Sequence, residues 1–177
     1  MAKEKSERHW EATAALILLA IGAGVFAFLA QGRLTRYEVV PVVSGPALAK
    51  TAGVEFDRFS ALRERNPEGE QLRVSLRLRT NEESDLACYV FVVARNDGAT
   101  PKVWTIWPTQ TPGSAITAGG HFHGRDPQSG HSMTLTGSWS RVTATLPYPP
   151  SGQPYNTVSV YVVGDDGQVL LARPFGT

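Results

Sequence analysis

Residues 71–79 carry the pattern that most restricts the fold of this chain. Apolar and polar side chains alternate without a fault in this segment, as Leu72, Val74, Leu76 and Leu78 against Arg73, Ser75, Arg77 and Arg79. Side chains along a strand point in turn to the two faces of a sheet, so one face here is apolar and the other wet. The pattern predicts a half-buried strand.

Further strands are predicted along the rest of the chain. LACYVFVVA is apolar on both faces, as a central strand would be, and the turn signal RNDG leads from it to KVWTIW. MTLTG, SRVTATL and NTVSVYVV follow, and GDDG joins the last of these to QVLLARPF as a hairpin. Short strands, frequent turns and 12 prolines predict a mainly-β domain at 71–177, an antiparallel sandwich or barrel.

The N-terminal part has a different character. No residue from Ala12 to Gly32 is charged, and a helix of about 21 residues rises about 30 Å, the thickness of a hydrocarbon core. This run predicts a single N-terminal transmembrane α-helix at 12–32 after a short cytoplasmic tail at 1–11. The alternative is a signal peptide cut after Ala27.

Charge around this run predicts the orientation. Three basic residues precede it and two follow closely, a bias towards a cytoplasmic N-terminus. We therefore expect a single-pass protein of the bacterial inner membrane, with its β domain on the periplasmic side.

Residues 33–70 are predicted to be a linker that contains one short helix. Phe56, Phe59 and Leu62 stand at helical spacing, and Pro67 ends the run. We expect an amphipathic helix of about three turns there.

Composition excludes some classes of protein. The chain has 17 basic and 16 acidic residues, so no global field favours nucleic acid. Cys88 is the one cysteine, which excludes an intramolecular disulfide and a CxxC zinc site, and its apolar surroundings predict a buried hydrophobe.

Arginine greatly outnumbers lysine after the run. Residues 33–79 hold nine basic and six acidic residues, whereas residues 80–177 hold five and seven. Arginine is favoured at interfaces, so an acidic partner or lipid headgroups would suit the first half. The alternative is the solvated face of one strand, with arginine in place of lysine reflecting a high-GC genome.

The stretch TAGGHFHGRDPQSGHSM at 117–133 raises a metal hypothesis. His121 and His123 would share one side of an extended segment, with His131 and Met133 completing a site for copper or zinc. The alternative is a polar loop, because the stretch is rich in turn-forming residues. The loop also resembles the zinc loop of copper–zinc superoxide dismutases, but too few histidines are present and Cys88 has no partner, which excludes that family.

A second resemblance covers residues 86–120. CYVFVVARNDG, WTIWPTQ and SAITAGG resemble the pattern of a bacterial envelope-associated β-rich domain family of unknown function. The insertion ATPKV after the D-G turn departs from that pattern. The resemblance implies a non-catalytic binding or scaffolding domain and carries no active-site residues.

The sequence has no motif of an enzyme: G-x-S-x-G, H-E-x-x-H and a phosphate-binding glycine loop are all missing.

Small residues Ala20, Gly24 and Ala27 form a stripe on which another helix could pack. We therefore expect a non-catalytic accessory subunit, without cofactor, of a larger membrane complex of respiratory or photosynthetic type, with other subunits and the lipid bilayer as partners. The alternatives are a membrane-tethered copper- or zinc-binding protein and an envelope ligand-binding module.

Overall fold

The computed structural model describes residues 16–27, 36–47, 49–50, 53–67, 69–99, 103–109, 116–117, 121–122, 126–149 and 153–176. The chain divides into two compact units, Met1–Arg36 and Tyr37–Thr177. Almost all of the strand residues belong to the second unit.

The first unit contains a helix at residues 16–27. In the described part of the chain, no helix has both the length and the apolar character needed to cross a membrane. This finding contradicts the predicted transmembrane helix at 12–32, and with it the single-pass inner-membrane location and the predicted orientation.

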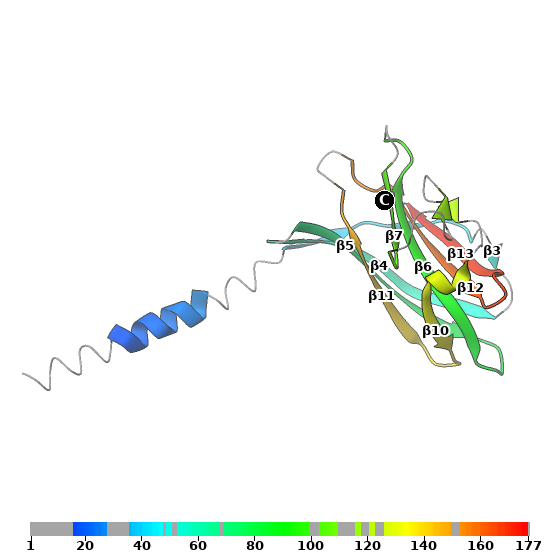
Figure 1. The fold of residues 1–177 in the computed structure, drawn as a ribbon, viewed down its shortest axis with the longest axis horizontal. Coiled ribbons are helices and arrows are strands. Elements are labelled where there is room, and N and C mark those ends of the chain that lie inside the picture. The colour runs from blue at the N-terminus through cyan, green and yellow to red at the C-terminus, as the bar shows by residue number, and fades with distance from the viewer. Residues whose placement is uncertain are drawn as a thin grey trace, which may run out of the picture. The chain divides into compact units, whose positions relative to one another are not determined.

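The second unit is mainly β, as predicted, and its described strands form two large sheets and one small two-stranded sheet (Figure 1). Sheet A has the order β1-β4-β5-β11. Its strands are β1 Arg36–Val40, β4 Val54–Asn66, β5 Gly69–Thr80 and β11 Ser140–Pro147. The long β4–β5 and β5–β11 pairs are antiparallel, and β11 is an edge strand.

Sheet B has the order β10-β6-β12-β13-β2, with β7 added to β6 and β3 to β13. Its strands are β2 Val43–Ser44, β3 Ala49–Lys50, β6 Leu86–Asn96, β7 Val103–Trp107, β10 His131–Leu135, β12 Thr157–Gly164 and β13 Val169–Gly176. The predicted hairpin at the end of the chain is confirmed as β12–β13. A small third sheet pairs β8 Ile116–Thr117 with β9 His121–Phe122, and a 3₁₀ turn η1 spans Pro127–Ser129.

The two sheets pack face to face and enclose the main core, which makes the domain a sandwich. The inward side chains of β5 are the four apolar residues of the alternating segment, and each is at most 2 % exposed. They pack against side chains of β6, β11 and β12. The prediction of one buried and one wet face for this segment is confirmed.

Cys88 on β6 belongs to the same core, as predicted. Its side chain is 1 % exposed, and burial raises the pKa of its thiol to about 12. Cys88 therefore acts as a small apolar side chain and not as a nucleophile.

The predicted amphipathic helix around Phe56 and Phe59 is wrong, because these residues lie on the long strand β4. Between Asp57 and Ser60 β4 advances three residues while its partner β5 advances two, from Arg77 to Ser75. This β-bulge adds one residue, and Arg58 within it has a left-handed backbone with φ 51°. The extra residue places Phe56 and Phe59 on the same face, where both rings stack on Phe175. A spacing of three that suggested a helix is thus the signature of a bulged strand.

Candidate anion-binding groove on the outer face of sheet A

Sheet A turns its polar face away from the core. Along β11 buried and exposed residues alternate strictly. On the outer face, residues that pair across strands form rows that run perpendicular to the strands. The two rows that matter most are Asp57–Arg77–Arg141 and Ser60–Ser75–Thr143.

Each arginine on the outer face of β5 is paired with a carboxylate of β4. Arg79 donates to Glu55 at 2.6 Å, Arg77 to Asp57 at 2.7 Å, and Arg73 lies 2.9 Å from Glu64. The hydrogen bond from Arg77 is the largest cause that lowers the pKa of Asp57. The prediction that Arg73, Arg77 and Arg79 share one face is confirmed, and their charges are largely balanced within the sheet.

Arg141 on β11 is different. It is the direct cross-strand partner of Arg77, and like charges in this position repel each other. Asp57 lies on the far side of Arg77, in the same row. Among the residues that the structure describes, no carboxylate pairs with Arg141. The row therefore ends in a positive charge that no described carboxylate neutralises.

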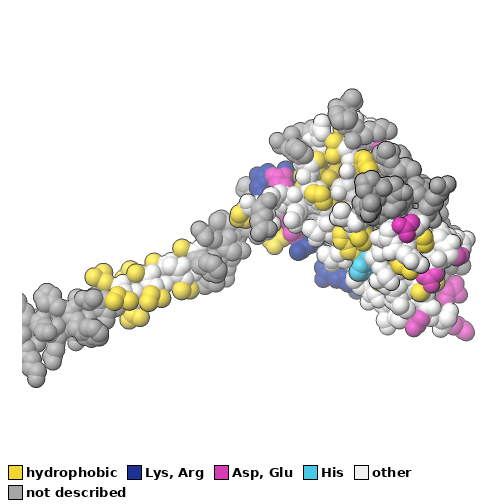
Figure 2. All heavy atoms as spheres, in the orientation of Figure 1, with side chains coloured by type: hydrophobic (Ala, Val, Ile, Leu, Met, Phe, Trp, Pro, Cys, Tyr) yellow, Lys and Arg dark blue, Asp and Glu magenta, His cyan; other side chains and the backbone are white. Residues whose placement is uncertain are grey.

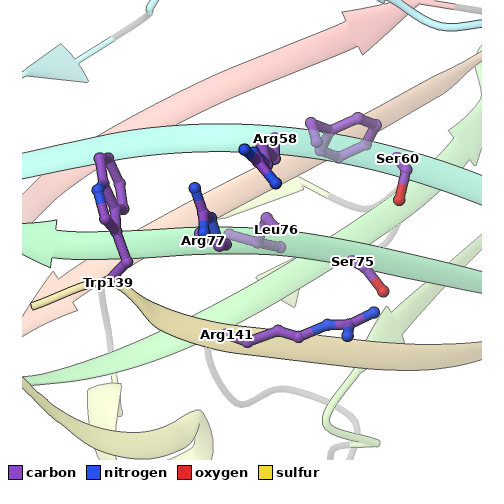
Figure 3. Close-up of a pocket in the computed structure, with 8 residues that line it drawn as sticks. Arg58, Ser60, Ser75, Leu76, Arg77, Trp139 and Arg141 are labelled. Atoms are coloured by element: carbon purple, nitrogen blue, oxygen red, sulfur yellow. The ribbon is translucent and has the colours of Figure 1, made fainter.

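A hollow of about 740 Å³ lies over this end of the row. Short side chains form its floor, since Ser60 and Ser75 face each other across β4 and β5. Its lining is Arg58, Phe59, Ser60, Ser75, Leu76, Arg77, Trp139 and Arg141, and we call this site the arginine groove. Figure 3 shows Arg58, Arg77 and Trp139 on one side of the serines, while the side chain of Arg141 extends towards Ser75.

Trp139 and the bulge shape the walls of the arginine groove. The indole of Trp139 lies against Arg79 and Arg77, whose guanidinium carbons are 4.6 and 5.4 Å from its ring centre. These contacts restrict both arginines. Arg58 projects from the bulge with its side chain 74 % exposed and contacts Asp57 at 3.5 Å, an interaction of little energetic weight at such exposure.

The arginine groove has unused hydrogen-bond donors. Arg77 Nε is buried without a hydrogen-bond partner among the described residues, and the described part of the chain offers none to the hydroxyls of Ser60 and Ser75 either. Guanidinium and hydroxyl groups in this arrangement bind an oxyanion through charge-assisted hydrogen bonds. The lining has no carboxylate, histidine or thiol to serve as general base or nucleophile.

Charged side chains are also unevenly distributed over the surface of the β domain. On the face shown in Figure 2, basic side chains gather at the left of the β domain with some acidic side chains beside them, whereas the charged side chains at the right are acidic. The uneven distribution seen along the sequence is thus also uneven in space. It raises the local concentration of an acidic ligand near the basic side.

The structure describes the predicted metal site only in part. His131 lies on β10 with its ring centre 4.9 Å from that of Trp107, and Met133 is half-buried against the main core. His121 lies on β9, but its side chain and all of His123 are outside the described residues. No cluster of three His, Cys, Asp or Glu side chains that could hold a metal occurs within the described ranges. Copper or zinc binding by this loop stays a prediction.

The predicted packing stripe lies on the helix at residues 16–27, which contains Ala20, Gly24 and Ala27. A side chain added at Gly24 would meet no atom within 4 Å in the described structure. The role of these residues in helix packing stays a prediction.

Sequence reasoning found three arginines of the outer face but missed Arg141 and Trp139. The alternation in SRVTATL marks a strand with Arg141 on its wet side. The cross-strand register that sets Arg141 against Arg77 follows only from the fold.

We found no protein family, no curated protein and no solved structure that matches this chain.

Proposed function

We propose that this chain is a non-catalytic accessory subunit, and that its β-sandwich docks onto another protein of a larger complex through the outer face of sheet A. The observation that carries this proposal is the charge of Arg141, which lies opposite Arg77 across the two strands and for which the described residues supply no carboxylate. Natural proteins keep such local conflicts where a ligand or partner resolves them.

The composition of the arginine groove supports docking. Arginine and tryptophan are enriched at protein interfaces and often carry much of the binding energy. The groove is built on paired strands, which hold donors more rigidly than loops do. Trp139 further restricts two of the arginines, so little side-chain freedom is lost when a partner binds.

Native sizing of tagged full-length protein from its own cells tests this proposal. We expect the unchanged chain to migrate within a larger assembly, and an Arg58→Ala/Arg141→Ala variant to migrate as free chain. Arg65→Ala is the matched control, because Arg65 is also a β4 arginine with a 57 % exposed side chain but pairs with Glu70 away from the groove. Circular dichroism of the double variant checks that the sandwich is folded.

The proposal is contradicted if the unchanged chain migrates alone, or if the double variant stays in the assembly.

A further inference from the structure

The arginines on the outer face of sheet A differ in whether they have a carboxylate partner. Each arginine on this face of β5 has a carboxylate on the neighbouring strand β4. Arg141 faces Arg77 on one side, and β11 is the edge strand of sheet A in the described part of the chain, so no described strand offers a carboxylate on the other side. The row Asp57–Arg77–Arg141 thus lacks a second carboxylate among the described residues.

We infer that the arginine groove binds an extended acidic segment of a partner protein, one carboxylate of which pairs with Arg141. This inference rests on the proposed function and names the chemistry of the partner. The hydroxyls of Ser60, Ser75 and Thr143 form the adjacent row and donate hydrogen bonds to the same carboxylate or to the peptide carbonyls beside it.

The shape of the site favours a chain over a single ion. A hollow of about 740 Å³ holds a ligand of several residues, since pockets for drug-sized ligands have roughly 300–1,000 Å³. Side chains on one face of an extended segment repeat every two residues, about 6.8 Å apart. Acidic side chains on one face of such a segment would meet the arginines that line the groove, Arg141 from β11 and the exposed Arg58 from β4.

A carboxylate is favoured as the ligand of Arg141, because the other arginines on this face already pair with carboxylates. Arg79, Arg77 and Arg73 each pair with a carboxylate of β4 at 2.9 Å or less. A small oxyanion such as phosphate would meet the same guanidinium groups, but it would fill only part of the hollow. The experiment must separate these two ligands.

Fluorescence anisotropy with the full-length protein makes this separation. The probe is a labelled peptide of alternating glutamate and threonine, about as long as β11, at low ionic strength. The control peptide has glutamine in place of glutamate. We expect binding of the acidic peptide only, with affinity that falls as salt screens the charges.

Substitutions locate the binding. Arg141→Ala should weaken binding roughly fivefold to tenfold, the effect of losing one solvent-accessible charge-assisted hydrogen bond. Arg65→Ala should leave the affinity unchanged. Arg141→Glu should abolish binding of the acidic peptide and permit binding of a peptide with lysine in place of glutamate.

Three results would overturn the inference: equal binding of both control and acidic peptides, no effect of Arg141→Ala, or binding of inorganic phosphate through Arg141 without binding of the peptide. The last result would assign a small-oxyanion site. If the peptide fails but native sizing still shows an assembly that depends on Arg58 and Arg141, the proposed docking function stands and only the acidic segment is wrong.

Discussion

The rings of Phe59 and Phe175 stack with their centres 3.6 Å apart and their planes inclined by 8°. Phe59 follows directly after the bulge in β4, whereas Phe175 lies on β13 of sheet B. This contact ties the bulge to the opposite sheet. It also connects the arginine groove, which Phe59 lines, to the core of the sandwich.

A double-mutant cycle measures this connection. Phe175 is 1 % exposed, so Phe175→Ala should lower the free energy of unfolding by about 3 kcal/mol or more. Phe59→Ala should cost less, about 2 kcal/mol, because the ring is only half-buried. Urea denaturation of both variants and the double variant should show coupling of about 1 kcal/mol. Strictly additive effects would mean that the stacked pair adds nothing beyond burial.

The backbone conformation of the bulge predicts how a glycine at position 58 would change the stability of the domain. Arg58 has φ 51°, a left-handed conformation that glycine adopts without the steric cost of a Cβ atom. Arg58→Gly should therefore leave the free energy of unfolding unchanged or raise it by up to about 1 kcal/mol. A loss of more than about 1 kcal/mol would show that the arginine side chain stabilises the bulge, contrary to its exposure.

Low pH should reduce the stability of the domain, because protonation of Asp57 weakens its ion pair with Arg77 on the outer face of sheet A. The hydrogen bond from Arg77 lowers the folded-state pKa of Asp57 below its unfolded value. Its contribution to stability is therefore present above the unfolded pKa and is lost as the pH falls through the folded pKa. Asp57→Asn should be less stable than the unchanged chain at neutral pH, and the difference should shrink on acidification below about pH 4. A constant difference at all pH values would exclude this linkage.

The sequence predicted best those structural features that depend on residues close together in the chain. The alternation along β5 depends on period alone, and the predicted strand and its buried face are confirmed. The helix predicted around Phe59 fails because one inserted residue in a strand imitates helical spacing. The transmembrane prediction is contradicted, because no helix in the described part of the chain has the length and apolar character needed to cross a membrane. The sequence could not identify Arg141 as a residue of the candidate site, because its role depends on which residue lies opposite it on the neighbouring strand.

Metal analysis tests the prediction that the histidine loop binds copper or zinc. The measurement compares purified full-length protein with a His121→Ala/His123→Ala variant. A site of this kind should give about one copper or zinc per chain in the unchanged protein and none in the variant. No metal in either protein would leave these histidines as residues of a polar loop.

The most direct test of the unpaired charge of Arg141 in sheet A is the stability of an Arg141→Thr variant without any partner. Threonine already occupies the next two outward positions of β11, Thr143 and Thr145, so the strand tolerates it. If Arg77 and Arg141 repel each other, the variant should be more stable at low ionic strength by about 0.2–1 kcal/mol, and the gain should disappear in about 1 M salt. A variant that is equally or less stable at low salt would show that the charge of Arg141 is already satisfied within the chain, and the groove would lose its reason to bind an acidic partner.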